Sequence, residues 1–142
     1  MVIAVIGENC TGKSTLADRL KKDFNATVYS GKDYLRLAKS PAEAEAVFKN
    51  ALAQSVSGGN IIYIISESEH MKLLPEKCFK ILVTAPLDVI KERFAVRMRG
   101  TLPPPVELML ERNHGKFDNI DCDFHYKNAD EYEALTDKIR SF

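Results

Sequence analysis

A phosphate-binding motif near the start of the chain is the strongest chemical signal in the sequence. It has the form GxxxxGK[ST], and its residues are Gly7, Glu8, Asn9, Cys10, Thr11, Gly12, Lys13 and Ser14. In such a loop, backbone N–H groups surround a polyphosphate, the lysine reaches the β- and γ-phosphates, and the hydroxyl binds Mg²⁺. We therefore predict that residues 7–15, which include Thr15, bind ATP, with Lys13 as a catalytic residue and Ser14 as a metal ligand.

A group of arginines in the second half of the chain is the next signal: Arg93, Arg97, Arg99 and Arg112. Arg93 and Arg97 are one helical turn apart and so share a face, while Arg99 enters a Gly-Thr and proline segment that we expect to be mobile. Guanidinium groups beside a hinge suit a lid over a phosphoryl-transfer site, and we predict Arg93, Arg97 and Arg99 as catalytic residues and Arg112 as a substrate-binding residue. The alternative is a solvated face paired with Glu92 and Glu111.

A second metal contact is expected after the apolar run at residues 61–65, where acids often support Mg²⁺ through water. No aspartate follows this run, and Glu67 is the nearest candidate. The alternative is that Glu67 and Glu69 belong to a solvated loop. His70 is a lone histidine, and we expect it at the surface or capping a helix.

The elements that must position these residues follow from apolar periodicity. Strands are predicted at residues 2–6, 26–30, 61–65, 80–84 and 123–127. Helices are predicted over 13–24, from the Ser40-Pro41 start to before Gly58, around 87–94, through 108–110, and after the Asn128 cap. Alternation of strand and helix predicts an α/β fold, with a parallel sheet, helices on both faces and ligands at the carboxyl ends of the strands.

Length, composition and charge limit the classes of function that the sequence supports. The chain has 142 residues, 45% of them hydrophobic, which predicts one domain over residues 1–142. Twenty Lys plus Arg balance twenty Asp plus Glu, so global charge favours neither nucleic acid nor an anionic membrane as a partner. Three cysteines without a CxxC pair fit free thiols and a cytoplasmic location. No apolar run is long enough for a signal peptide core with its flanks or for a membrane span.

A segment after the second predicted strand resembles adenylate kinase. Ser30-Gly31-Lys32-Asp33-Tyr34-Leu35-Arg36 is similar to the Ser-Thr-Gly-Asp-x-Leu-Arg stretch of that family, although Lys32 breaks the spacing. The resemblance implies that Arg36 grips the phosphate of an acceptor nucleotide and that Asp33 orients an acceptor hydroxyl or the water shell of the metal. The alternatives are a helix cap for Asp33 and a surface arginine for Arg36.

The region from Pro86 to Asn128 resembles the lid and last strand of guanylate kinase. The matching pieces are Arg-Met-Arg-Gly-Thr at 97–101, Glu-Arg at 111–112, Phe-Asp at 117–118 and Tyr-Lys-Asn at 126–128. With the phosphate loop, most of the chain is similar to nucleoside monophosphate kinases and to small-molecule relatives such as shikimate kinase. The resemblance implies a three-layer α/β/α fold with a five-stranded sheet in the order 2-3-1-4-5, a lid at about 97–112 and an acceptor segment at about 31–58.

The chain departs from guanylate kinase because residues 31–58 lack its β-rich, tyrosine-bearing GMP-binding segment. We expect an ATP- and Mg²⁺-dependent phosphotransferase that acts on a small acceptor, with a nucleoside monophosphate first and a hydroxylated metabolite of the shikimate or gluconate type second. A nucleotide-binding regulator or ATPase without an acceptor is a separate alternative. An RNA-end kinase is disfavoured because the charge is balanced. The sequence leaves open the choice between ATP and GTP and the oligomeric state.

Overall fold

A parallel sheet forms the centre of the computed structural model, which describes residues 1–142. Its strands are β1 (Val2–Ile6), β2 (Thr27–Ser30), β3 (Ile61–Ile65), β4 (Phe79–Val83) and β5 (Phe124–Tyr126). They lie in the order β2-β3-β1-β4-β5, and every neighbouring pair is parallel. The predicted fold class and strand order are therefore confirmed, and each strand lies within two residues of its predicted bounds.

The two central strands are β1 and β3, and every residue of both is buried. Their register runs from Val2 opposite Ile61 to Ile6 opposite Ile65. Continuous apolar runs of this kind are typical of parallel strands that are covered on both faces. β2 lies at an edge and is only partly buried, which agrees with its more polar sequence.

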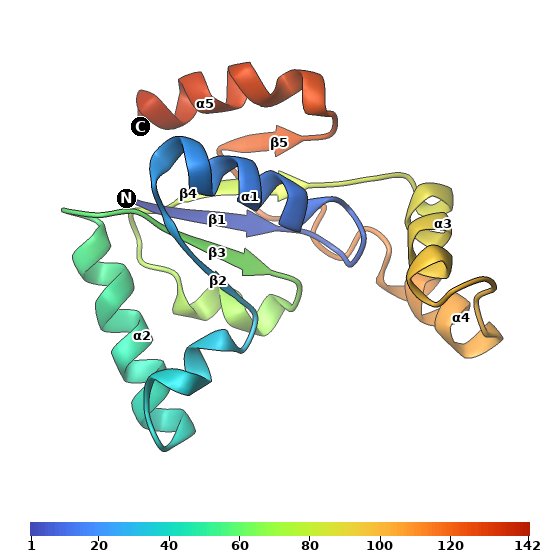
Figure 1. Ribbon diagram of the computed structural model, residues 1–142, viewed down its shortest axis with the longest axis horizontal. Helices are drawn as coiled ribbons and strands as arrows, with labels where there is room; N and C mark the ends of the chain where they lie inside the picture. The colour runs from blue at the N-terminus through green and yellow to red at the C-terminus, as the bar shows by residue number, and fades with distance from the viewer.

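Helices cover both faces of the sheet (Figure 1). On one face lie α1 (Lys13–Phe24) and α5 (Tyr132–Arg140), which pack against the larger core cluster of 15 buried residues. On the other lie α2 (Pro41–Ser55) and the 3₁₀ helix η2 (Ser68–Leu73), which contribute to a second cluster of 12. Phe117, from the segment that precedes β5, also belongs to this second cluster.

The predicted helix starts are confirmed by their caps. The Ser40 hydroxyl accepts a hydrogen bond from the Glu43 backbone N–H at 3.2 Å, and Pro41 occupies the first helical position of α2. Asn128 and Glu131 form a reciprocal capping box at η3 (Ala129–Glu131), a 3₁₀ turn that leads directly into α5. The sequence did not predict the 3₁₀ character of η3, of η2 or of η1 (Asp33–Leu37).

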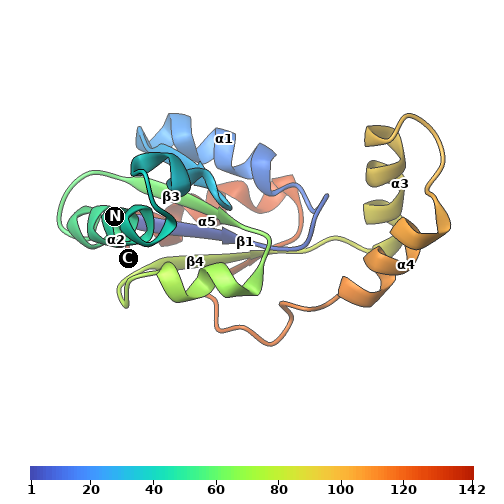
Figure 2. The ribbon, with the colours of Figure 1, turned by 90° about the horizontal axis from the view of Figure 1, so that it is seen from below.

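Two further helices form a hairpin that projects beyond the carboxyl ends of the strands (Figures 1 and 2). They are α3 (Leu87–Arg97) and α4 (Pro104–Asn113). The predicted lid at about 97–112 corresponds to the end of α3, the connection and most of α4. Glu111 pairs with Lys91 at 2.7 Å and not with an arginine, so the alternative in which the arginine face pairs with Glu111 does not occur.

The hairpin has a small core of its own. It consists of Cys10, Ile90 and Leu110, with partly buried neighbours that include Phe94 and Leu102. Cys10 belongs to the phosphate loop, so the loop supplies part of the apolar surface on which the hairpin packs. No helix of the protein is both long enough and apolar enough to cross a membrane.

Candidate nucleotide site

The phosphate loop connects the end of β1 with the start of α1 at the carboxyl edge of the sheet. Cys10 and Gly12 have left-handed backbone conformations, with φ of 63° and 99°. Turns of this kind direct successive N–H groups into an anion-binding concavity. Gly7 has a different role, because a Cβ atom there would lie 2.4 Å from the carbonyl oxygen of Val83 on β4.

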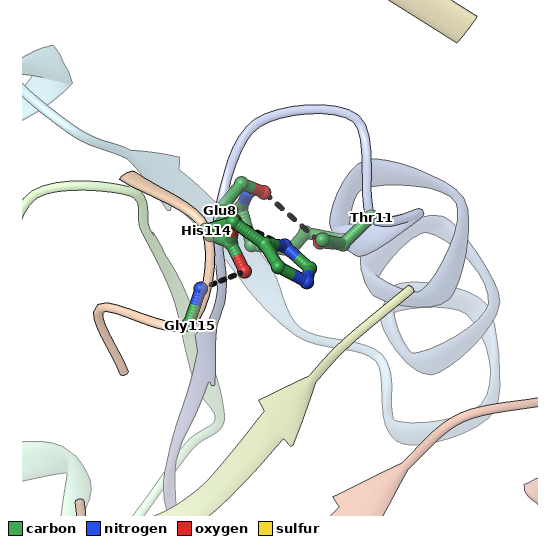
Figure 3. A network of polar contacts seen from close by, with 5 residues as sticks. Glu8, Thr11, His114 and Gly115 are labelled. Atoms are coloured by element: carbon green, nitrogen blue, oxygen red, sulfur yellow. Dashed lines mark hydrogen bonds and ion pairs between the residues drawn. The ribbon is translucent and has the colours of Figure 1, made fainter. Parts of the chain in front are cut away.

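The side chains of the loop divide into a buried and an exposed group. Glu8, Cys10, Thr11 and Lys13 are buried, whereas Asn9, Ser14 and Thr15 face solvent. The Thr11 hydroxyl donates to the backbone carbonyl of Glu8 at 3.0 Å (Figure 3). The Lys13 ammonium donates to the same oxygen. The loop is therefore held in shape by its own polar groups.

Lys13 is a buried cation without a carboxylate partner, and its side chain bonds only to the Glu8 carbonyl. The pKa of Lys13 is lowered to about 8, chiefly by burial, and the positive charges of Lys116 and Arg97 contribute to this lowering. The Glu8 carboxylate acts in the opposite direction but is a smaller influence. A bound polyphosphate would supply the direct anionic partner that Lys13 lacks.

Two of the predicted arginines lie beside the loop. The Arg93 guanidinium donates to the Cys10 carbonyl at 3.0 Å. Arg97 is close enough for its positive charge to lower the pKa of Lys13. The other two lie elsewhere. Arg99 is exposed in the connection between α3 and α4, where its φ is 62°, and Arg112 lies on the surface of α4 beside Leu108 and Met109.

A cavity of about 720 Å³ opens between the loop, α3 and the segment that links β5 to α5. Arg93 and Arg97 line it together with Thr15 and Arg19 of α1. Its volume is within the range of about 300 to 1,000 Å³ that is usual for small-molecule sites. The Arg19 guanidinium lies 3.6 Å from the centre of the Tyr132 ring, which fixes one wall of the cavity.

The predicted acceptor residues lie at the carboxyl end of β2, on the edge of the sheet that also carries the loop. The Asp33 carboxylate accepts from the Ser30 backbone N–H at 2.9 Å and so stabilises the turn before η1. Arg36 is exposed and forms no ion pair, and its guanidinium lies 5.8 Å from the centre of the Tyr29 ring. The structure thus leaves Arg36 available to an anion.

The expectation that His70 lies at the surface or caps a helix is wrong, because its residue is only 5% exposed. Its ring packs near the rings of Tyr34 and Tyr63, with centroids 6.4 and 6.3 Å away, and its Nδ1 has no hydrogen-bond partner. The Tyr63 hydroxyl donates to the Gly31 carbonyl at 2.7 Å, and burial raises the pKa of Tyr63. Nothing in the polar sequence around His70 indicates this burial.

The oxygen groups at the loop suit Mg²⁺ together with a nucleotide. Ser14 is exposed at the start of α1, and Glu67 is exposed two residues beyond Ile65, whose carbonyl accepts from the Gly7 N–H at 3.1 Å. Hydroxyl and carboxylate oxygens are ligands that Mg²⁺ prefers, usually alongside substrate phosphates and water. No cluster of three His, Cys, Asp or Glu side chains could hold a metal ion by itself. Mg²⁺ binding here would therefore depend on phosphate oxygens.

Sequence reasoning missed the side-chain contacts of Glu8. One carboxylate oxygen of Glu8 lies 3.1 Å from Nδ1 of His114, and the other accepts from the Gly115 backbone N–H at 3.1 Å (Figure 3). Sequence reasoning also missed Lys116, whose charge is close enough to lower the pKa of Lys13. Because more than 100 residues separate these groups from the loop, no local pattern could have indicated the contacts.

The sequence matches no known protein-family model and no curated protein. Solved structures do resemble the chain. A putative kinase from Chloroflexus aurantiacus J-10-fl is 22% identical with a TM-score of 0.64, over 99% of this chain and 93% of that one. A shikimate kinase from Bacteroides thetaiotaomicron is 13% identical with a TM-score of 0.63, over 99% and 96%. A deoxyadenosine kinase from M. mycoides with bound dCTP is 14% identical with a TM-score of 0.57, over the whole of both chains. This chain therefore has the fold of the small P-loop kinases.

Proposed function

We propose that the protein is a small-molecule kinase that transfers the γ-phosphoryl group of ATP to an acceptor bound near β2. The observation that carries the proposal is the arrangement of Lys13, Arg93 and Arg97 around a phosphate loop, at the mouth of a cavity of nucleotide size. The fold shared with kinases supports it.

The donor nucleotide would place its polyphosphate on the loop amides and its remaining part in the 720 Å³ cavity. Lys13 would contact the β- and γ-phosphates, and Arg93 and Arg97 would stabilise charge on the transferring group. Ser14 and Glu67 would hold Mg²⁺, which neutralises phosphate charge when it is bound. These cations act by electrostatic stabilisation, and because they are already positioned, the reaction requires little rearrangement of the site.

The acceptor would lie at the carboxyl ends of β2 and β3, where Arg36 can bind an anionic group bidentately. A nucleoside monophosphate is the first candidate, and its phosphate would be held by Arg36. A hydroxylated acid of the shikimate or gluconate type is the second candidate, and its carboxylate would be held by the same guanidinium. Asp33 would orient the acceptor with the carboxylate oxygen that Ser30 does not use.

In the proposed reaction, an acceptor oxygen forms a bond to the γ-phosphorus while the bond from that phosphorus to the bridging oxygen of ADP breaks. If the acceptor is an alcohol, its proton passes to solvent as the new bond forms; if the acceptor is a phosphate, it attacks as an anion. The predicted lid, residues 97–112, would close over the donor and exclude water.

All three cysteines are free thiols, which suits the reducing conditions of the cytoplasm.

A panel of acceptors tests the proposal. ADP release from Mg-ATP is measured with nucleoside monophosphates, shikimate, gluconate and RNA ends, and each reaction is repeated with the Lys13→Ala variant. We expect ADP release to depend on one acceptor class and to be lost in the variant. ADP release that no acceptor stimulates would contradict the kinase and favour an ATPase or regulator. Acceptor-dependent turnover that survives in Lys13→Ala would contradict the role of Lys13.

A further inference from the structure

Glu8 introduces a negative charge into a loop whose proposed ligand is an anion. The residue is only 7% exposed, and both of its carboxylate oxygens have partners in the segment that follows α4. Because a carboxylate is only an acceptor, the hydrogen shared with His114 must reside on its Nδ1. Two hydrogen bonds donated to a charged group would therefore fix this segment against the loop.

The segment fixed by Glu8 carries a cation. Lys116 directly follows Gly115, and it is one of the two positive charges that lower the pKa of Lys13. Lys116 forms no ion pair with a carboxylate; its ammonium lies 5.2 Å from the centre of the Phe117 ring. An exposed ammonium without a counter-charge beside a phosphate loop is free to contact phosphate oxygens.

The backbone of Glu8 completes the connection. Its carbonyl accepts from both Thr11 and Lys13, so one residue joins the lysine of the loop to the segment that bears Lys116. The chain at this point is also anchored on its far side, because Phe117 is 1% exposed and packs in the core beneath the sheet. The position of Lys116 is thus constrained by a hydrogen-bonded group before it and a buried ring after it.

We propose that Glu8 is a positioning residue whose bonds to His114 and Gly115 hold Lys116 beside the phosphate loop, where Lys116 binds the polyphosphate of the donor nucleotide. This inference rests on the proposed function, because it takes the loop to be the donor site.

The test is a double-mutant cycle on nucleotide binding without any acceptor. The affinity for Mg-AMP-PNP is measured by calorimetry for the wild type, Lys116→Ala, Glu8→Ala and the double variant, with Lys138→Ala as a matched control on the exposed side of α5. We expect Lys116→Ala and Glu8→Ala each to weaken binding by about tenfold, and the double variant to lose little more than either single variant. Affinity for adenosine, which has no phosphate, should remain at the wild-type value in all of them.

Hydrogen exchange at the Gly115 amide gives a readout that does not depend on nucleotide. We expect this amide to be protected in the wild type and in Lys116→Ala, and to exchange faster in Glu8→Ala. If Glu8→Ala does not fold, His114→Ala replaces it, because His114 is exposed and supplies one of the two bonds. We expect His114→Ala to weaken AMP-PNP binding severalfold on its own and to cause no further loss when it is combined with Lys116→Ala.

The inference is overturned if Glu8→Ala binds AMP-PNP as tightly as the wild type or more tightly, or if the losses in the cycle are additive. Unchanged binding in Lys116→Ala overturns it too. A wild-type protein that is folded but binds no AMP-PNP would instead contradict the proposed donor site itself. The two failures are therefore distinguishable.

Discussion

The proposed donor and acceptor regions both lie at the carboxyl edge of the sheet but differ in how their charged side chains are held. On the donor side, Lys13 and Arg93 both donate to carbonyl oxygens of the phosphate loop. On the acceptor side, Arg36 is exposed and forms no ion pair, and its guanidinium lies 5.8 Å from the centre of the Tyr29 ring. The donor site is preorganised before any ligand binds, whereas the acceptor site must be completed by its ligand.

The attachment of the two regions to the protein differs as well. The aromatic rings of the acceptor side pack into the 12-residue core, where Tyr34 stacks on Phe48 with centroids 5.3 Å apart. The hairpin on the donor side rests on a cluster of only 3 buried residues. We therefore expect the hairpin to move more readily than the acceptor wall, and its position to depend on the polar contacts with the loop.

The largest expected effect tests preorganisation on the donor side. Arg93→Met should lower kcat by about a hundredfold, because it removes a fixed cation from the transferring group. The comparison variant is Arg112→Met, because Arg112 does not line the cavity beside the loop and its loss should leave kcat unchanged. Steady-state kinetics with the identified acceptor provides the measurement. Equal losses in both variants would mean that the two arginines act together, for example after a larger closure of the hairpin.

A second substitution addresses the acceptor side. Arg36→Met should raise the KM for the acceptor by about ten- to thirtyfold and leave the KM for ATP unchanged, because only the acceptor anion contacts this guanidinium. Lys39→Met is the control, since it removes an exposed cation three residues away. A change in the KM for ATP alone would place Arg36 on the donor side and remove the distinction between the two regions.

The pH dependence of nucleotide binding sharpens the comparison. The pKa of Lys13 is about 8 in the free protein, and a bound polyphosphate would raise it, so binding is coupled to proton uptake above pH 8. The affinity for AMP-PNP should be fully present below that pH and fall by up to about tenfold per unit above it. Lys13→Arg keeps its charge and should show no such fall. If the affinity falls equally steeply with pH in both proteins, a group other than Lys13 causes the pH dependence.

The smallest effect concerns stability. The pKa of Lys13 is lower in the folded protein than its ordinary value of 10.5, so at pH 7 the buried charge destabilises the unliganded fold. Lys13→Met should raise the free energy of unfolding by on the order of 1 kcal/mol at pH 7, as is common when a functional charge is removed. The difference should shrink as pH rises from 8 to above 10.5, which urea denaturation of both proteins would measure. A less stable variant at pH 7 would show that the bond to Glu8 outweighs burial.

Most of the fold could be predicted from the sequence because its signals are local. The fully buried strands at 2–6 and 61–65 are uninterrupted apolar runs, and the capping residues at Ser40 and Asn128 mark helix starts within a few positions. The phosphate loop is equally local, since its strand, glycines and helix are contiguous. These features depend on neighbours in sequence and so appear directly in it.

The features that could not be predicted depend on contacts across the chain. His70 follows a polar stretch, yet the packing of Tyr34 and Tyr63 encloses it. Glu8 occupies a variable position of the motif, and only the fold reveals its partners at His114 and Gly115. The arginine face of α3 was predicted from its helical spacing. The spacing did not predict which of these arginines reach the loop, because their reach depends on the angle at which the hairpin leaves the sheet.

The reactivity of the Cys10 thiol depends on whether the hairpin is packed on the phosphate loop. The residue is only 5% exposed and packs with Ile90 and Leu110 of the hairpin. Any movement that lifts the hairpin from the loop would uncover the sulfur and let a small alkylating reagent reach it, while Cys122 stays accessible and Cys78 stays in the core. The rate at which the reagent labels Cys10, measured with and without nucleotide, would thus report how readily the hairpin separates from the phosphate loop. No probe has to be introduced.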